Sequence, residues 1–272
     1  MVRSITKDTV LCMSLAARPS NIGTRFHNFL YAELDLDFLY KAFTTTDLAA
    51  AIAGIRALGI RGCGISMPYK EACIPLVDSM DDSAAAIQSV NTIVNSDGHL
   101  RAYNTDYVAI SKLLAEHEVR ADSTFAVLGS GGMAKAVVAA LRDAGLQAGA
   151  VVARNAQTGT GLAEQYGYTW RAELGPCRPQ LVVNATPVGM LGGPAADDLP
   201  VDSDVVDQAE TIFDVVALPA LTPLVRRAIA RDKKVITGAE VITLQALEQF
   251  VLYTGVRPTE DQVRRASEFS RG

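Results

Sequence analysis

Apolar residues along the chain fall alternately into short β-branched runs and into longer stretches with helical spacing. In the first third, the spacing predicts strands over residues 9–14, 36–43 and 61–67, and helices over 21–34 and 45–59. Residues 91–104 carry a hairpin signal around Asp97-Gly98, and a helix is predicted over 105–118. Strands that alternate with helices indicate an α/β fold with parallel sheets.

A second α/β unit follows from about residue 106. Its predicted parallel strands lie in the segments 123–129, 148–154, 179–190, 210–216 and 233–238, separated by stretches of helical length. Two closing helices are predicted over 239–256 and 259–270. The pattern therefore predicts two α/β domains of similar size.

Composition narrows the class of protein. The chain has 272 residues, 49% of them hydrophobic and 20% charged, with a net charge of −5, which is ordinary globular composition without a nucleic-acid footprint. We expect no membrane segment, because no run of 18 apolar residues occurs and the first residues lack a signal-peptide core. Four scattered cysteines and three scattered histidines argue against zinc and for free thiols, hence a cytoplasmic protein.

The segment 125–141 joins an apolar strand to a glycine loop and an amphipathic helix. The loop is Gly129-Ser130-Gly131-Gly132, followed by Met133. Glycines permit a tight turn and close approach of a pyrophosphate, and a helix N-terminus offers free N–H groups to it. A P-loop is disfavoured because Lys135 falls inside the helix. The alternative is a structural turn that binds nothing.

The next predicted strand ends in Arg154-Asn155, with no carboxylate. Folds that bind NAD usually place an acidic residue there, whereas an arginine suits the 2′-phosphate of NADP. The sequence therefore favours NADP, with NAD left possible. The alternative for Arg154 is a solvent-facing turn residue.

Six short motifs resemble those of the shikimate/quinate dehydrogenase family and occur in the same order. They are SMPYKEA (66–72), SVNTIV (89–94), YNTDY (103–107), GSGGMAKAV (129–137), NATPVGM (184–190) and GAEVITLQA (238–246). Weaker similarity at RFHN extends the resemblance to nearly the whole chain. The resemblance implies a substrate domain at 1–105 completed by the C-terminal helices 239–272, a Rossmann-type NADP domain at 106–238, and a cleft between them.

The resemblance also implies a catalytic pair. Lys70 and Asp106 match the lysine and aspartate that handle the proton of the reacting hydroxyl in this family. Oxidation of a secondary alcohol needs a group that takes up this proton as the hydride leaves. Read alone, Lys70 is typical of a solvated surface residue and Asp106 of a helix N-cap.

Further residues are assigned by the same resemblance. Asn91 and Gln245 match residues that bind the polyol ring and the carboxylate, with a hairpin residue and a helix-face residue as the alternatives. Thr186, Val215 and Gly238 match the nicotinamide pocket.

Several positions depart from the family pattern. Asn21 and Gly23 stand where members carry two serines that grip the substrate carboxylate, and Thr24 replaces a proline. Gly64 replaces an asparagine and Ser66 a threonine. Each lost polar contact should cost about 1–3 kcal/mol. The chain therefore resembles a divergent branch that retains the catalytic pair but has a changed recognition surface.

Two more departures concern the cofactor domain. Ala217 replaces a tyrosine, and Thr158 lies where a second basic residue often holds the 2′-phosphate. The leading interpretation is an NADP-dependent oxidoreductase acting on shikimate or a close cyclic hydroxy acid. Quinate or an amino analogue as substrate, and a dinucleotide-binding sensor without turnover, remain alternatives. We expect a small-molecule substrate, no nucleic-acid or membrane partner, and a monomer or homodimer.

Overall fold

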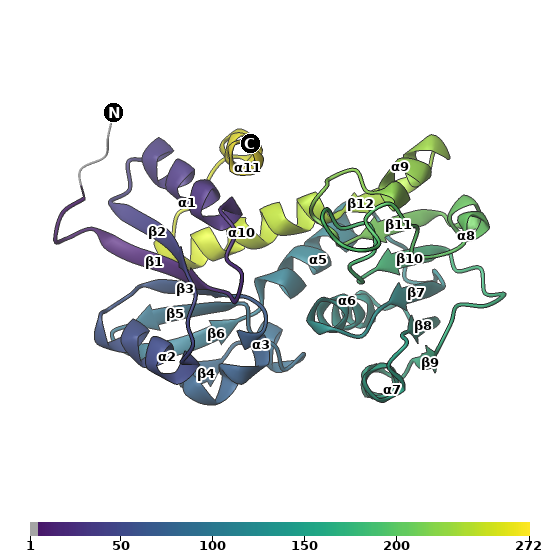
Figure 1. The fold of residues 1–272 in the computed structure, drawn as a ribbon, viewed down its shortest axis with the longest axis horizontal. Helices are drawn as coiled ribbons and strands as arrows, with labels where there is room; N and C mark the ends of the chain where they lie inside the picture. The colour runs from purple at the N-terminus through teal and green to yellow at the C-terminus, as the bar shows by residue number, and fades with distance from the viewer. Residues whose placement is uncertain (1–4) are drawn as a thin grey trace. The chain divides into compact units, whose positions relative to one another are not determined.

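A computed structural model describes residues 5–272. The chain divides into two compact units. The first unit combines the described residues up to Thr105 with Thr243–Gly272, and the second unit is Asp106–Ile242. The boundaries between the units fall within helix α5 (Thr105–Glu116) and helix α10 (Gly238–Thr254), which are labelled in Figure 1.

The first unit contains a six-stranded sheet of order β2-β1-β3-β5-β6-β4. Its strands are β1 (Val10–Leu15), β2 (Phe38–Phe43), β3 (Gly62–Ile65), β4 (Ser79–Met80), β5 (Thr92–Ser96) and β6 (His99–Tyr103). Parallel pairing joins β1 to β2 and β3, and β4 to β6, as predicted, whereas β5 runs antiparallel to both β3 and β6. The Asp97-Gly98 hairpin accounts for the pairing of β5 with β6, because both residues have positive φ (52° and 88°) and the chain reverses at once.

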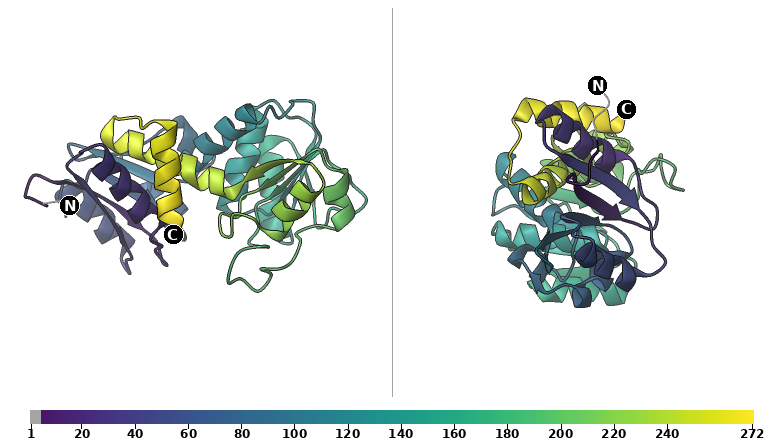
Figure 2. Two further views of the ribbon diagram at one scale, coloured as in Figure 1. Left: turned by 90° about the horizontal axis from the view of Figure 1, so that it is seen from above. Right: turned by 90° about the vertical axis from the view of Figure 1, so that its left-hand side faces the viewer.

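Helices cover both faces of this sheet. One face packs against α1 (Ile22–Glu33), α10 and α11 (Glu260–Arg271), and the other packs against α2 (Leu48–Ala57) and α3 (Tyr69–Ala72). Two short helices, η1 (Ile74–Leu76) and α4 (Asp82–Ala85), complete the unit. Helix α11 lies along α1 in Figure 2, and its N-terminus is fixed by a capping box between Thr259 and Gln262.

Glycines on β3 leave room for aromatic rings on the face that packs against α1 and α10. A Cβ atom on Gly62 would lie 2.2 Å from the ring of Tyr253, which is on α10 and only 1% exposed. The absence of a side chain at this position therefore permits the close packing of α10 on the sheet.

The second unit is built on a six-stranded sheet in which all paired strands are parallel. The strands are β7 (Phe125–Leu128), β8 (Gly149–Val152), β9 (Thr169–Arg171), β10 (Leu181–Asn184), β11 (Thr211–Asp214) and β12 (Lys234–Thr237). Their order, β9-β8-β7-β10-β11-β12, is the 3-2-1-4-5-6 order of a Rossmann fold. The order reverses between β7 and β10, so a dinucleotide site is expected at the carboxyl ends of these two strands.

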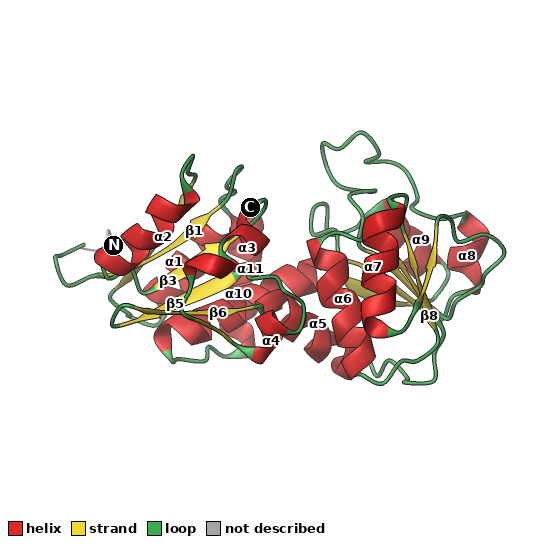
Figure 3. Cartoon of the chain, turned by 90° about the horizontal axis from the view of Figure 1, so that it is seen from below, coloured by secondary structure: helices red, strands yellow, loops and turns green. Residues whose placement is uncertain are grey.

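Helices also flank this second sheet. Helices α6 (Gly132–Asp143) and α7 (Ala156–Tyr166) lie on one side, and α8 (Ser203–Gln208) and α9 (Pro223–Ala230) lie on the other (Figure 3). The residues of β7, β10 and β11 are all buried, as expected for central strands covered on both faces. Within residues 5–272, no helix combines the length and apolar character needed to cross a membrane.

Candidate active site

A buried polar cluster in the first unit contains two of the predicted substrate residues. The side-chain amide of Asn91 donates to the Thr105 hydroxyl at 3.0 Å, and the Asn91 side-chain oxygen accepts from the Thr105 backbone N–H at 2.7 Å. The Thr105 hydroxyl also lies 3.5 Å from Oε1 of Gln245. Asn91 and Thr105 are only 3% and 1% exposed, so the ends of β5 and α5 are held together by a nearly dry hydrogen-bond network.

Lys70 is joined to this cluster through the backbone. It lies in the single turn of α3 that follows the strand β3 and Pro68, as its position after an apolar run predicts. The Val90 N–H donates to the Lys70 carbonyl at 2.9 Å, which places the backbone of Lys70 beside the residue that precedes Asn91. The Lys70 side chain is partly exposed.

The sequence interpretation missed two members of the cluster, Thr92 and Gln249. The Gln249 amide donates to the Thr92 hydroxyl at 2.9 Å and to the Asn91 carbonyl at 3.2 Å. Gln245 and Gln249 are four residues apart on α10, and so they lie on the same face of the helix. Two glutamines at this spacing in an apolar helix were the available signal.

Two other predicted substrate residues lie outside this network. Ser66 is exposed, and its backbone N–H donates to the Leu15 carbonyl at 2.9 Å. Asn21 is the exposed N-cap residue of α1, and its side chain makes no capping hydrogen bond. Their roles toward a substrate stay predictions.

Asp106 is the second residue of α5 and only 6% exposed. Its interpretation as an N-cap residue is wrong, because the helix already begins at Thr105. Asp106 follows directly on Thr105, the residue held by Asn91, so its backbone is fixed at the start of α5. Asp106 and Lys70 belong to different units, and their pairing stays a prediction.

The glycine loop of the second unit has the geometry of a phosphate-binding turn. Gly129 has a φ of 108°, and a Cβ atom there would lie 2.9 Å from the Ala185 carbonyl oxygen. Gly131, the N-cap residue of α6, and Gly132 have open space where a Cβ would stand. Met133 is half-buried in the first turn of α6, which contains no acidic residue. The free N–H groups of this turn suit the pyrophosphate of a dinucleotide.

The residues expected at the 2′-phosphate lie on the turn between β8 and α7. Arg154 is exposed, and Asn155 caps α7 by accepting from the Thr158 N–H at 3.1 Å. The hydroxyls of Thr158 and Ser130 are 2.7 Å apart, which joins this turn to the glycine loop. The exposed guanidinium and the two hydroxyls provide donors that fit a phosphate monoester.

The three residues predicted at the nicotinamide lie close together in the second unit; they are Thr186, Val215 and Gly238. Asn184, which the sequence interpretation missed, contacts two of them. Asn184, fully buried at the end of β10, accepts from the Thr186 hydroxyl at 2.6 Å, and its carbonyl accepts from the Val215 N–H at 3.0 Å. A Cβ atom on Gly238 would lie 2.5 Å from the Val215 carbonyl oxygen, so only glycine fits there. A buried asparagine that ends an apolar strand was the signal for this junction.

Asp214 supports the same junction from β11. It is fully buried and accepts hydrogen bonds from the Asn184 amide, the Val216 N–H and the Thr222 hydroxyl at 3.0, 3.0 and 2.6 Å. Burial raises the pKa of the Asp214 carboxyl, and these hydrogen bonds oppose the shift. The network fixes the carboxyl ends of β10 and β11, where Thr186 and Val215 stand.

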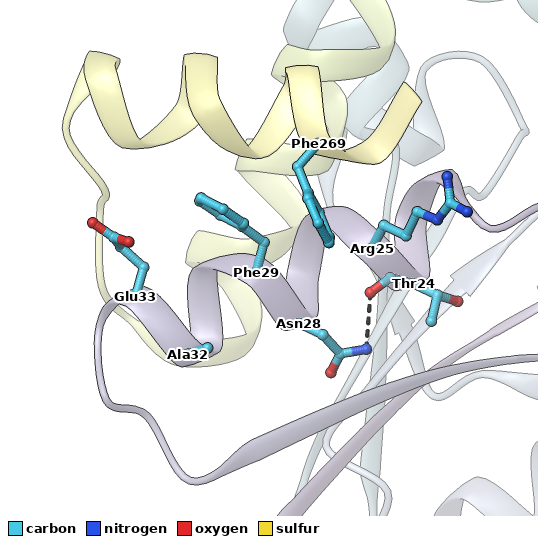
Figure 4. Close-up of a pocket in the computed structure, with 7 residues that line it drawn as sticks. All are labelled: Thr24, Arg25, Asn28, Phe29, Ala32, Glu33 and Phe269. Carbon is cyan, nitrogen blue, oxygen red and sulfur yellow. Dashed lines mark hydrogen bonds between the residues drawn. The ribbon is translucent and has the colours of Figure 1, made fainter. Parts of the chain in front are cut away.

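A groove on the surface of the first unit is separate from these residues. It lies between α1 and α11 and is lined by Thr24, Arg25, Asn28, Phe29, Ala32, Glu33 and Phe269 (Figure 4). The Phe29 and Phe269 rings are 5.3 Å apart and form its apolar part. None of the predicted site residues lines this groove, so we do not assign it to the substrate.

Comparison with known proteins identifies the family. Residues 21–93 match the family model described as the shikimate dehydrogenase substrate binding domain. The chain is 53% identical over 267 residues to the shikimate dehydrogenase-like protein of Haemophilus influenzae, covering 98% of each chain. It is 34% identical over 259 residues to the shikimate dehydrogenase (NADP(+)) of Chlorobium phaeovibrioides, covering 88% of this chain and 89% of the relative.

Solved structures give the same result. A shikimate 5-dehydrogenase-like protein superimposes with a TM-score of 0.96 at 52% identity, covering 99% of this chain and 100% of the other. The Thermus thermophilus shikimate 5-dehydrogenase in complex with NADP(H) and shikimate has a TM-score of 0.86 at 28% identity, covering 96% of this chain and 99% of the other. Quinate dehydrogenase of Corynebacterium glutamicum in complex with NAD superimposes with a TM-score of 0.85 at 26% identity, covering 96% of this chain and 98% of the other. The chain belongs to the shikimate dehydrogenase family.

Proposed function

We propose that the protein is an NADP-dependent oxidoreductase that interconverts shikimate, or a close cyclic hydroxy acid, and its 3-dehydro ketone. The observation that carries the proposal is the buried Asn91–Thr105 pair, which fixes the start of α5 immediately before Asp106. The residue before Asn91, Val90, donates to the Lys70 carbonyl and so holds the backbone of Lys70. Such rigid support is what an acid–base residue needs.

In this proposal Lys70 takes the proton of the reacting hydroxyl during oxidation and returns it during reduction. The carboxylate of Asp106 favours the charged lysine and holds its ammonium in place. Asn91 and Gln245 provide amide donors and acceptors for the ring hydroxyls, with Ser66 and Asn21 as weaker contributors from exposed positions. The chemistry supplied by bound NADP is the uptake or release of a hydride at the nicotinamide.

The residues proposed to hold NADP all lie in the second unit. Gly129, Ser130, Gly131, Gly132 and Met133 would contact the pyrophosphate, Arg154 the 2′-phosphate, and Thr186, Val215 and Gly238 the nicotinamide. The open positions above Gly131 and Gly132 support this, because a backbone without Cβ atoms admits a phosphate closely. NADP(H) in the Thermus thermophilus structure supports the same cofactor.

Quinate is the second candidate substrate. The solved quinate dehydrogenase has the same fold over almost the whole chain, and Gly23 and Gly64 remove side chains where family members recognise the substrate. These changes alter the contacts by which one cyclic hydroxy acid is distinguished from another.

The test is to follow reduced nicotinamide by absorbance while the protein is offered shikimate, quinate and amino analogues, with NADP and NAD in parallel. We expect oxidation of at least one of these acids with NADP. If none is oxidised with either cofactor, while NADP binds in a direct titration, the sensor interpretation replaces the enzyme.

A further inference from the structure

Two glycines at substrate-recognition positions of the first unit face the same hydroxyl group. A Cβ atom on Gly64 would lie 2.9 Å from the hydroxyl oxygen of Tyr40, and one on Gly23 would lie 3.7 Å from that same atom. Gly64 stands where the family resemblance places an asparagine, and Gly23 where it places a serine. The Tyr40 hydroxyl therefore reaches the place of both missing side chains.

Tyr40 is held rigidly on β2 by the residues of the RFHN motif. The Asn28 side chain accepts from the Tyr40 N–H at 2.9 Å and donates to the Tyr40 carbonyl at 2.8 Å. It also donates to the Thr24 carbonyl at 2.8 Å, the bond drawn in Figure 4. The His27 ring stacks on the Tyr40 ring, with centroids 4.4 Å apart and planes at 8°. These contacts fix the direction in which the phenol points.

The surroundings of the Tyr40 hydroxyl are polar. Ser14 on β1, which is paired in register with Gly64, is hydrogen-bonded to Tyr40 and partly exposed. The Cβ position of Gly64 also lies 3.5 Å from the amide nitrogen of Gln249. Gln249 donates to the Asn91 carbonyl, so Gly64 lies close both to the Tyr40 hydroxyl and to a side chain that holds the proposed substrate residue Asn91.

The charge state makes Tyr40 a donor. Burial raises the pKa of Tyr40, against a smaller opposing effect of the hydrogen bond with Ser14, so the phenol keeps its proton at neutral pH. Gly23 lies in the first turn of the 12-residue helix α1, which contains no acidic residue. A phenol donor next to the positive end of a helix favours an anionic oxygen over a cationic group.

We propose that the Tyr40 hydroxyl, supported by Ser14, donates a hydrogen bond to the carboxylate of the substrate in place of the side chains missing at positions 23 and 64. Tyr40 is thus a specificity-determining residue for a cyclic hydroxy acid. This inference rests on the proposed function, since the ligand is the substrate of the same reaction.

The experiment measures binding rather than turnover. Shikimate and its methyl ester are titrated calorimetrically into the protein saturated with NADPH, where no reaction occurs because both ligands are already reduced. The variant Tyr40→Phe removes only the hydroxyl. The matched control is Tyr253→Phe, another buried ring on the same sheet face whose hydroxyl deletion leaves Gly23 and Gly64 unaffected.

For Tyr40→Phe we expect shikimate affinity to fall about ten- to a hundredfold, as for loss of one hydrogen bond to a charged group. The ester should lose less, and Tyr253→Phe should bind shikimate within about twofold of the parent, since it touches no ligand group. An unchanged affinity in Tyr40→Phe, an equal loss in Tyr253→Phe, or an equal loss for acid and ester would overturn the proposal. So would a parent protein that does not bind shikimate.

A turnover assay of the same protein separates this proposal from the proposed function. If shikimate binds through Tyr40 but is not oxidised, the proposed reaction is wrong and the proposed role of Tyr40 in binding stands.

The variant Gly64→Ala tests the contact between Gly64 and Tyr40, because its Cβ would crowd the Tyr40 hydroxyl. We expect its loss of stability to be smaller in the Tyr40→Phe background, and strictly additive losses would contradict the contact.

Discussion

Gln249 on α10 donates a hydrogen bond of 2.9 Å to the hydroxyl of Thr92 on β5, and the same amide nitrogen lies 3.2 Å from the carbonyl oxygen of Asn91. One buried side chain from the C-terminal part of the chain thus orders the residue proposed to meet the substrate. Asn91 in turn holds Thr105 at the start of α5. The candidate site therefore depends on residues up to 158 positions apart in sequence.

Substitution of Gln249 by leucine should destabilise the protein. It removes both donations and leaves the buried Thr92 hydroxyl and Asn91 carbonyl without this partner, so we expect the free energy of unfolding to fall by about 1–3 kcal/mol. Urea denaturation gives the value. Gln208→Leu, at an exposed position of α8, is the matched control and should change stability by less than about 0.5 kcal/mol. Equal effects of the two variants would show that the Gln249 contacts contribute nothing specific.

Lys70→Ala should abolish turnover and leave NADP affinity close to that of the parent. The reason is that Lys70 belongs to the first unit, whereas every residue proposed to hold NADP belongs to the second. Initial rates and a fluorescence titration with NADPH measure the two properties. Lys7→Ala, whose side chain is 88% exposed, should behave like the parent. Retention of a tenth of the activity in Lys70→Ala would exclude this lysine as the proton-transfer residue.

Asp106→Asn should lose a large part of the rate while keeping the fold, because the amide matches the carboxylate in shape and removes only its charge. If that charge acts on Lys70, the pH at which the rate is half-maximal should also move. The pH–rate profiles of parent and variant are compared with that of Asp122→Asn, whose side chain is 79% exposed. A lower rate with an unmoved profile would make Asp106 a positioning residue only.

The order of elements was predictable because it depends on local periodicity. The strands and helices named from the sequence are present, and the glycine loop lies between β7 and α6 as expected. The hairpin around Asp97-Gly98 was also predictable, and β5 and β6 pair antiparallel on either side of it. The antiparallel pairing of β5 with β3 was not predictable, because local periodicity does not show which strand lies beside β5.

The site residues that the sequence interpretation missed are those that act through other residues. Gln249 and Thr92 contact Asn91, and Asn184 contacts Thr186 and Val215. Gln249 lies outside the motifs of the family resemblance, and Thr92 and Asn184 lie inside them at positions to which the resemblance assigned no role. From the sequence, Gly64 was likewise recognised only as the loss of the asparagine side chain that family members carry at this position. That Tyr40, 24 positions earlier in the sequence, reaches the same space is a consequence of strand register, with β1 lying between β2 and β3.

His27 should make stability depend on pH. It is fully buried, and burial lowers its pKa from 6.5 to about 3, against a smaller opposing effect of Gln249. The folded protein therefore binds this proton more weakly than the unfolded chain does. The stability from neutral His27 is complete above pH 6.5 and is lost as the pH falls toward 3. Between pH 7 and pH 5 the loss should be about 2 kcal/mol.

Urea denaturation at pH 7 and pH 5 measures this dependence. His27→Leu removes the titrating ring, and the difference between its two values should be about 2 kcal/mol smaller than in the parent, whatever its absolute stability. His99→Asn is the control, because the His99 side chain is 58% exposed and its loss should leave the dependence intact. A parent and a His27→Leu variant with the same pH dependence would show that the buried ring is not its source.

Arg154 should set the preference between cofactors. Its exposed guanidinium follows β8 on the turn that also contains Thr158, whose hydroxyl is 2.7 Å from that of Ser130 in the glycine loop. One arginine–phosphate contact at an exposed position is expected to favour NADP over NAD by about ten- to a hundredfold. Arg154→Ala should therefore raise the Michaelis constant for NADP and leave that for NAD nearly unchanged.

Salt and a second arginine test the same contact independently. An exposed ion pair is screened by ions, so raising the salt concentration should reduce the NADP preference of the parent and have little effect on Arg154→Ala. Arg142→Ala, at the C-terminal end of α6 and therefore at the opposite end of the helix from the glycine loop, should keep the preference. If Arg154→Ala loses affinity equally for both cofactors, Arg154 acts structurally. In that case Arg154 does not distinguish NADP from NAD.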